Sequence, residues 1–334
     1  MSVKVSVCMT TYNHERYVAQ AVESALMQQT NFDFEIVVGE DCSPDGTRAI
    51  LRELQERHPD KIRLLLRDEN IGVGRNFIDT LNACRGEFVA LLDGDDYWTS
   101  SHKLQKQVDF LRRHADFACC GHEVEHVYEN DEPPGLRQKA GDKTIYTLKD
   151  VLLGRAYLPT RSMVFRRRLL PEFPPWFKEI TLGDWALQVL LADQGRLRFF
   201  PDSMAVYRIH DGGVWTRMDH RDRVRAIIRQ CGYYRRHFGY RYRRVIQKRI
   251  ARAYLRLSDL EAEEGNVALA RKAFFRGVGL CVITPCIVRR LVERYLRLFV
   301  PSIAPTWYRL HRLRRRLFPF ARVARPVPNT NEEE

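Results

Sequence analysis

The sequence lacks a run of apolar residues long enough to cross a bilayer. Its longest stretch without a charged residue lies between Arg276 and Arg289 and contains Pro285, whereas a transmembrane helix needs about 20 predominantly apolar residues. No signal peptide is visible, because Ser2 and Lys4 lead straight into a strand-like segment. We therefore expect a cytoplasmic protein without a membrane-spanning helix.

Cysteine occurs eight times, but never as a CxxC pair. This pattern favours buried thiols in a reducing compartment over a disulfide framework or a zinc ribbon. His122 and His126 follow Cys119 and Cys120 closely, yet the sequence offers no second half of a metal site. The turn after the first predicted strand, Thr10-Thr-Tyr-Asn13, also lacks the GxGxxG pattern, which argues against a dinucleotide-dependent oxidoreductase.

Charge is distributed unevenly along the 334 residues, whose net charge is +13. Between Arg221 and Arg325 there are 27 Arg and Lys against 6 Asp and Glu, whereas the first 220 residues are net acidic. Such an asymmetry indicates an anionic partner surface, either a membrane or a nucleic acid. Because no recognised nucleic-acid motif is present, we expect no nucleic-acid partner.

The first 115 residues alternate between strand-like and helix-like patterns. β-Branched apolar runs are followed by apolar residues at helical spacing, which favours a parallel sheet in a three-layer α/β/α arrangement. The predicted strands are 3–9, 34–39, 62–66 and 87–92, and the predicted helices are 18–26, 47–57, 75–83 and 103–113.

Polar residues follow each of these strands, and the carboxyl ends of parallel strands share one edge of the sheet. Asp93, Asp95 and Asp96 come directly after the apolar strand Phe88–Leu92. Three converging carboxylates repel one another unless a hard cation with oxygen ligands offsets the repulsion. By itself this cluster is equally compatible with a solvated acidic turn.

From Asp116 onward the alternation decays, and three parts of the chain are expected. Residues 1–218 form an α/β catalytic domain, 219–325 a basic helical extension and 326–334 a disordered tail. Within the extension, residues 254–275 resemble one tetratricopeptide unit, but stable arrays need about three repeats, so we expect a helical hairpin. Within the domain we expect a strand at 117–127, a polar loop at 129–143, a strand at 162–165, a helical stripe at 182–190 and a short strand at 205–209.

Four segments together resemble family 2 glycosyltransferases with the GT-A fold. The resemblance covers about residues 3 to 215 and implies a Rossmann-like mixed sheet and an inverting, nucleotide-sugar-dependent, metal-dependent transferase. The four segments are Val5-Ser-Val-Cys-Met-Thr-Thr-Tyr-Asn13, Glu40-Asp-Cys-Ser-Pro-Asp-Gly-Thr47, Glu69-Asn-Ile-Gly-Val-Gly-Arg-Asn76 and Leu92-Asp-Gly-Asp-Asp-Tyr-Trp98.

The resemblance also implies roles for individual residues. The nucleoside diphosphate would be held by residues after the first three strands, with Asp41 accepting from the base, and Asp93 would contact the ribose. Asp95 would hold Mn²⁺ or Mg²⁺ as in the family's DxD motif, and Asp96 would be a ligand or a supporting residue. The implied nucleotide-sugar contacts are Thr10, Tyr12, Asn13, Asp41, Arg75, Asp93, Asp95 and Arg208. For Asp41, an Asx turn with Ser43 is the alternative.

Asp184 is the candidate catalytic base, since the acceptor hydroxyl must lose a proton as it attacks the anomeric carbon. The family's acidic pair is here Gly183-Asp184, so one carboxylate is missing. A helix-capping Asp is the alternative interpretation. Trp185 is either part of an acceptor platform or, on its apolar stripe, part of the core.

The segment Tyr207-Arg-Ile-His-Asp-Gly-Gly-Val-Trp215 resembles the part of many family members that closes over the diphosphate. His210 is a candidate metal ligand, with a packed core histidine as the alternative, and Arg208 would neutralise the leaving group. Trp215 is a candidate for the acceptor platform.

The basic extension interleaves arginines with apolar residues, as in Arg289–Arg297, which is typical of a helix lying on an anionic membrane. The enzyme would then be peripheral on the cytoplasmic face and act on a glycan or lipid-linked acceptor, in cell-surface polysaccharide synthesis. A bundle packed on the catalytic domain is the alternative for the extension, and a catalytically weak nucleotide-sugar-binding relative is the alternative for the whole chain. A UDP-sugar is the first expectation for the donor, by family frequency alone; the acceptor and the oligomeric state are not readable from the sequence.

Overall fold

The structure is a computed structural model that divides into two compact units, Met1–Ala253 and Tyr254–Glu334. The expected domain boundary at residue 218 stays a prediction. The described residues are 3–129, 143–170, 172–180, 183–213, 218–280, 291–292, 294–295 and 298–299. The expected disordered tail, the basic run Arg312–Arg316, Trp215 and most of the expected polar loop at 129–143 lie outside them.

The first part of the sheet is parallel, as the alternating pattern predicts. Its strands are short, apolar and buried, which is typical of a parallel sheet covered on both faces. In spatial order β3, β2, β1 and β4 lie side by side. The elements are β1 (Val5–Thr11), α1 (Val18–Leu26), β2 (Phe34–Glu40), α2 (Thr47–Arg57), β3 (Ile62–Leu66), α3 (Val73–Ala83) and β4 (Phe88–Asp93).

The second part of the sheet is mixed and continues from β4 in the order β8, β6, β9 and β5, while β7 also pairs with β9. β6 and β9 run parallel, whereas β8 is antiparallel to both β4 and β6. The elements are β5 (Tyr97–Trp98), α4 (Lys103–Arg113), β6 (Phe117–Tyr128), β7 (Ile145–Tyr146), α5 (Leu148–Leu152), β8 (Val164–Arg166), α6 (Gly183–Gln194) and β9 (Arg196–Ile209), with 3₁₀ turns η1 (Thr160–Ser162), η2 (Arg167–Leu169) and η3 (Pro175–Glu179).

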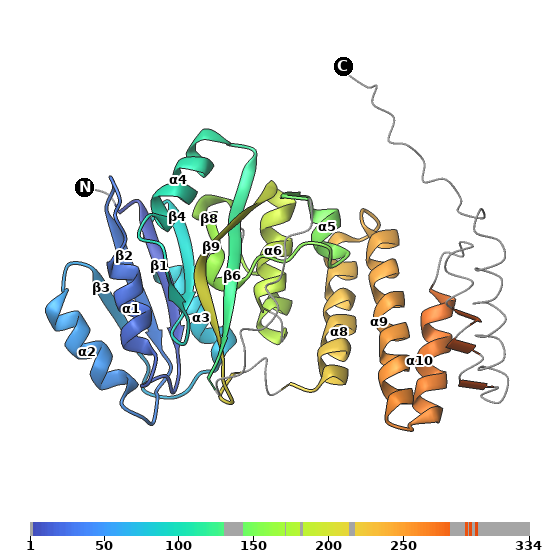
Figure 1. The fold of residues 1–334 in the computed structure, drawn as a ribbon. Helices are drawn as coiled ribbons and strands as arrows, with labels where there is room; N and C mark the ends of the chain where they lie inside the picture. The colour runs from blue at the N-terminus through green and yellow to red at the C-terminus, as the bar shows by residue number, and fades with distance from the viewer. Residues whose placement is uncertain are drawn as a thin grey trace, which may run out of the picture. The chain divides into compact units, whose positions relative to one another are not determined.

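Helices cover both faces of the sheet (Figure 1), and an apolar core lies on each face. Side chains of α1, α2 and α4 contribute to one core, and those of α3, α5 and α6 to the other, where α8 (His220–Phe238) packs against α6. Successive residues of a strand point to opposite faces, so Val7 belongs to the first core and its neighbour Cys8 to the second. This is the expected three-layer arrangement.

β9 is much longer than the strand expected at 205–209. It pairs with β6 along most of its length, but the register shifts between His122 and Glu123 and again before Glu125. A bulge breaks the alternation of inward and outward side chains, and β9 itself contains Pro201. The sequence pattern therefore revealed only the last, regular part of the strand.

The basic helices begin with α8, whose Cys231 and Tyr234 are buried in the core shared with α6. α9 (Arg243–Glu263) follows, and in the second unit α10 (Val267–Gly279) buries Ala270 and Phe274. Among the described residues, no helix is both long and apolar enough to cross a bilayer.

Candidate active site

The carboxyl ends of β1, β2 and β4 meet at one edge of the sheet. In the register of β1 and β4, Thr10 lies opposite Asp93, and in that of β1 and β2, Thr11 lies opposite Glu40. The Gly94 N–H donates to the Thr10 carbonyl at 2.9 Å, and the Asp41 N–H donates to the Thr11 carbonyl at 3.1 Å. The chain segments expected to bind the nucleotide are therefore adjacent.

The acidic loop turns tightly after β4. A Cβ on Gly94 would lie 2.7 Å from Cβ of Thr11, so only glycine lets the loop approach β1 this closely. The three carboxylates differ in exposure: 33% of the Asp93 side chain is exposed, 16% of Asp95 and 1% of Asp96. Asp93 and Asp95 are thus the members that a substrate can reach.

Asp96 is held inside the protein by Arg161 of η1. The Arg161 Nε lies 2.6 Å from one carboxylate oxygen of Asp96, and the other oxygen accepts the Arg208 N–H at 3.0 Å. Burial raises the pKa of Asp96 well above its usual value, and the Arg161 charge opposes this rise. Of the two expected roles of Asp96, this geometry favours the supporting one over direct metal ligation.

Arg161 also reaches Asp93, whose carboxylate lies 3.8 Å from the guanidinium. Burial, followed by repulsion from Asp95, raises the pKa of Asp93 to about 6. The guanidinium stacks 4.0 Å from the ring centroid of Tyr207, and the Arg161 carbonyl accepts from the Trp98 indole at 2.9 Å. Arg161 is therefore a buried counter-ion, fixed on three sides, for two of the three carboxylates.

Asp95 has two imidazoles beside it. His210 Nε2 lies 3.1 Å from the Asp95 Oδ2, and His14 Nε2 lies 3.7 Å from the same oxygen. Burial alone would raise the pKa of Asp95, but the His210 hydrogen bond and the charges of His14 and Arg161 together lower it. The Asp95 carboxylate is accordingly the member of the cluster best kept ionised.

A divalent cation at this edge would find its donors around Asp95. Among the described residues, no group of three or more His, Cys, Asp or Glu side chains is arranged to hold a metal ion. The Asp95 carboxylate would suit Mn²⁺ or Mg²⁺, and the neighbouring His210 imidazole would suit a first-row transition metal. They fit a cation whose remaining ligands come from substrate phosphates and water.

Arg208 lies near the end of β9 and ties that strand to the acidic loop. Its guanidinium donates to the Asp95 carbonyl at 2.8 Å and also bonds Gln20. It lies over the rings of Tyr17 and Tyr97, with 4.6 Å to the centroid of the latter. A cationic group is thus fixed beside the acidic loop.

The other expected nucleotide contacts lie along the same edge. The buried Asp41 carboxylate accepts the N–H groups of Ile71 and Gly72 at 2.9 and 3.0 Å. It therefore shapes the turn that leads into α3, where Arg75 is exposed. Tyr12 is 44% exposed, and Asn13 has a φ of 60°, a conformation that asparagine tolerates better than most residues.

Asp184 lies in the first turn of α6, at the same edge of the sheet. It is close enough to Asp93 for its charge to raise the pKa of Asp93. One Asp184 oxygen accepts the Trp185 N–H at 2.7 Å, and the other accepts the Tyr157 hydroxyl at 2.5 Å. Trp185 is buried, and its indole donates to the Val151 carbonyl at 3.1 Å, so Trp185 belongs to the core rather than to an acceptor platform.

Three residues of the site were not singled out from the sequence: His14, Tyr157 and Arg161. His14 directly follows the first-strand loop, and Arg161 is a lone charge beside an apolar strand, so both carried a usable signal. Tyr157 lies in the irregular segment between α5 and η1, where no pattern marks it.

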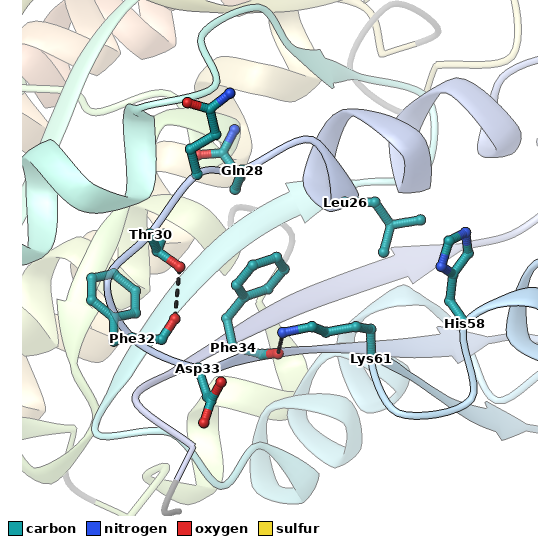
Figure 2. Close-up of a pocket in the computed structure, with 9 residues that line it drawn as sticks. Leu26, Gln28, Thr30, Phe32, Asp33, Phe34, His58 and Lys61 are labelled. Carbon is teal, nitrogen blue, oxygen red and sulfur yellow. Dashed lines mark hydrogen bonds between the residues drawn. The ribbon is translucent and has the colours of Figure 1, made fainter.

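Two features of the described residues lie away from this edge: the buried His122 and a cavity at the amino end of β2. His122 is fully buried beside Cys119 and Cys120, which fits the expectation of packed side chains rather than metal ligands. A cavity of about 430 Å³ lies at the amino end of β2, the opposite edge of the sheet (Figure 2). Phe32, Phe34 and Lys61 are among its lining residues, and none of the acidic loop residues takes part.

Relatives in sequence match part of the chain. An uncharacterized protein of Mycobacterium tuberculosis is 39% identical over 215 residues, which are 63% of this chain and 60% of that protein. An uncharacterized glycosyltransferase of Nostoc is 34% identical over 215 residues, 62% of this chain and 65% of its own length. A Bacillus subtilis protein named as a teichuronic acid biosynthesis glycosyltransferase is 37% identical over 123 residues, 36% of this chain and 47% of that protein. The chain thus spans less than two thirds of the length of these relatives.

Solved structures share the fold. TarS of S. aureus, residues 1–349, in complex with UDP-GlcNAc superposes with a TM-score of 0.57 at 20% identity, over 83% of this chain and 89% of that one. The mannosyltransferase PcManGT of Pyrobaculum calidifontis, in complex with GDP-Man and Mn²⁺, superposes with a TM-score of 0.56 at 18% identity, over 96% and 88%. The expected GT-A fold is confirmed.

The family model of glycosyl transferase family 2 matches residues 6–172. The match includes the first-strand loop, the acidic loop and Arg161, whereas Asp184, Arg208 and His210 lie beyond it. By this match across half of its length, the chain belongs to glycosyl transferase family 2.

Proposed function

We propose that the protein is an inverting glycosyltransferase that moves a sugar from a nucleoside-diphosphate donor to a hydroxyl group of a glycan or lipid-linked acceptor. The observation that carries this proposal is the meeting of Asp93, Asp95, Arg208 and Asp184 at one edge of the sheet. Such a displacement needs carboxylates that bind the donor and accept the proton, and a positive charge beside the leaving group.

The donor would lie along the carboxyl ends of β1, β2 and β4. Thr10, Tyr12, Asn13, Asp41 and Arg75 would contact the nucleotide, and Asp93 would contact the ribose. The solved structures of TarS with UDP-GlcNAc and of PcManGT with GDP-Man support a nucleotide-sugar as the donor class. A UDP-sugar is our first choice, and the UDP-GlcNAc bound to TarS supports it.

Asp95 and His210 would hold the divalent cation, Mn²⁺ or Mg²⁺, with Asp96 supporting the loop from inside the protein. When bound, the cation would stabilise negative charge on the diphosphate. Arg208 would add a fixed positive charge on the same side, since its guanidinium is already held beside Asp95.

Asp184 would take the proton from the acceptor hydroxyl. As that oxygen forms its bond to the anomeric carbon, the bond from this carbon to the diphosphate oxygen breaks, and the configuration inverts. The nucleoside diphosphate leaves with the electron pair. Asp184 is suited to this role because its carboxylate lies at the edge where Asp93 would hold the donor.

The acceptor would be a growing cell-surface polysaccharide or its lipid-linked precursor. The relative named for teichuronic acid biosynthesis supports polysaccharide synthesis. The arginine-rich C-terminal helices would hold the enzyme on an anionic membrane, as a peripheral protein on the cytoplasmic face, since Arg and Lys near a membrane surface contribute about 1 kcal/mol each.

The proposal is tested with Asp184→Asn and Asp95→Ala, assayed with a panel of nucleotide-sugars and Mn²⁺ or Mg²⁺. Asp184→Asn should reduce transfer by about 10²-fold or more while nucleotide affinity, measured by calorimetry, stays nearly constant. Asp95→Ala should abolish the stimulation of nucleotide binding by metal. Loss of nucleotide binding in Asp184→Asn would make Asp184 structural, and metal stimulation retained in Asp95→Ala would refute the Asp95 assignment.

A catalytically weak relative that only binds nucleotide-sugars is the second candidate function, and Gly183 favours it because one acid of the family's pair is missing. The same panel separates the two candidates. An enzyme releases nucleoside diphosphate from one donor in the presence of metal and acceptor, whereas a binder retains that donor intact.

A further inference from the structure

Tyr157 contacts the carboxylate that would act as base. Its hydroxyl donates to Asp184 Oδ2 at 2.5 Å, while Asp184 Oδ1 accepts the Trp185 N–H at 2.7 Å. Both oxygens therefore have a donor from the protein, which fixes the orientation of the carboxylate. Each carboxylate oxygen has two lone-pair sites, so Oδ2 can accept from the phenol and from a substrate hydroxyl at the same time.

The contact is built into the fold through Gln188, one helical turn after Asp184 on α6. The fully buried Gln188 side chain forms two hydrogen bonds with the backbone of Leu158, the residue after Tyr157. Its Oε1 accepts the Leu158 N–H at 2.8 Å. Its Nε2 donates to the Leu158 carbonyl at 2.9 Å. The segment carrying Tyr157 is thus anchored to the helix that carries Asp184, and the two side chains keep their relative position.

The Tyr157–Asp184 pair lies within the electrostatic environment of the donor site. The Asp184 charge raises the pKa of Asp93. The charges of Asp184 and Arg161 act on the pKa of Tyr157 in opposite directions. Burial, with the charge of Asp184, raises the pKa of Tyr157 well above its usual value, so the phenol keeps its proton and stays a donor. From α8, Tyr234 also lies within electrostatic reach of Asp184.

We infer that Tyr157 is a positioning residue for Asp184. This inference rests on the proposed function of Asp184 as base. Asp184 is itself partly exposed, so an acceptor can approach its carboxylate while the Tyr157 hydroxyl holds Oδ2 in place.

Tyr157→Phe tests the inference, because it removes the hydroxyl and keeps the ring. We expect kcat to fall about ten- to a hundredfold, with the KM for the donor and the affinity for nucleoside diphosphate unchanged. A carboxylate that loses a donor holds its proton more tightly, so the acidic limb of the pH–rate profile should move to higher pH. Tyr157→His keeps a ring donor and should recover part of the lost kcat.

Tyr240→Phe is the matched control, since Tyr240 is 86% exposed and lies after the end of α8, away from Asp184 in the chain. It should leave kcat and the pH profile unchanged. Wild-type kcat in Tyr157→Phe, or a lower kcat with an unmoved acidic limb, would overturn the inference and leave the proposed function intact. Transfer by Asp184→Asn at the wild-type rate would instead contradict the proposed function of Asp184 as base.

Discussion

At the scale of single residues, the acidic loop depends on one buried arginine. Asp93, Asp95 and Asp96 would repel one another in any compact loop, and a bound cation is only one way to offset this. Arg161 is 8% exposed and contacts two of the three carboxylates. The Arg161 charge therefore offsets part of the repulsion within the loop.

Arg161→Met should destabilise the protein because it leaves Asp96 buried without its partner. Removing one member of a buried ion pair costs about 3 to 5 kcal/mol, which chemical denaturation would measure as a lower free energy of unfolding. The double variant Arg161→Met/Asp96→Asn should recover part of this loss. Equal stability of the single and double variants would show that the pair is not coupled.

Residue-level analysis of the sequence found the acids and two of their partners, His210 and Arg208, but missed the others. Asp93, Asp95 and Asp184 stand out because carboxylates follow strands or open a helix at expected places. Arg161, Tyr157 and His14 act through contacts with residues far along the chain, such as the 2.6 Å ion pair between Arg161 and Asp96. No local pattern encodes such a contact.

At the scale of elements, close packing of α3 on β2 positions the turn before α3, which belongs to the third segment expected to bind the nucleotide. A Cβ on Gly39 would collide with the Thr80 hydroxyl and lie 2.6 Å from Asn76 Oδ1. Asn76 in turn donates to the Gly39 carbonyl at 2.8 Å. The helix that begins beside Arg75 is thus set against the strand that ends before Asp41.

Gly39→Ala should push α3 away from β2 and lower the free energy of unfolding by about 1 to 3 kcal/mol, the usual cost of overpacking. Nucleotide affinity should fall with it, because the turn before Arg75 moves. Gly232→Ala in α8 is the control, because nothing lies within 4 Å of a Cβ added at Gly232. It should stabilise the protein by roughly 0.5–1 kcal/mol, since alanine favours helix interiors. Gly39→Ala as stable as wild type would refute the close approach.

Element prediction succeeded where the hydrophobic pattern stays regular. β1 to β4 and α1 to α4 are short, continuous elements, and each was expected within a few residues of its observed bounds. β9 was underestimated because bulges against β6 interrupt its alternation. The two-residue strands β5 and β7 exist only through pairing with β9, so they carry no periodic signal of their own.

At the scale of the whole molecule, the first 220 residues and the rest of the sequence differ in charge. The sheet lies in the net acidic part, while basic residues dominate from α8 onward. Part of this basic region is packed rather than free, since Cys231, Tyr234 and Ile246 are buried. The alternative of helices packed on the catalytic core therefore holds for α8, and membrane binding stays a proposal for the residues beyond it.

The full-length protein should sediment with vesicles that contain anionic phosphatidylglycerol and not with vesicles of neutral phosphatidylcholine. Binding should weaken as salt rises, because surface charges are screened over about 8 Å at physiological ionic strength. Replacing Arg312, Arg314, Arg315 and Arg316 with Gln should reduce sedimentation while transfer to a water-soluble acceptor continues. Equal binding to neutral vesicles, or binding unaffected by the four substitutions, would contradict the proposed membrane role of this run.

The sequence by itself determined the family, the parallel part of the sheet and the acids at its edge, because short apolar runs and the polar residues that follow them are local features. Tertiary structure alone decided that Asp96 forms an ion pair with Arg161. It also placed Asp95 beside His14 and His210, and the Tyr157 hydroxyl within hydrogen-bond distance of Asp184. These contacts join residues that are 27 to 115 positions apart. Only the folded chain brings such residues together, because their proximity follows from how the strands and helices pack and not from any pattern along the sequence.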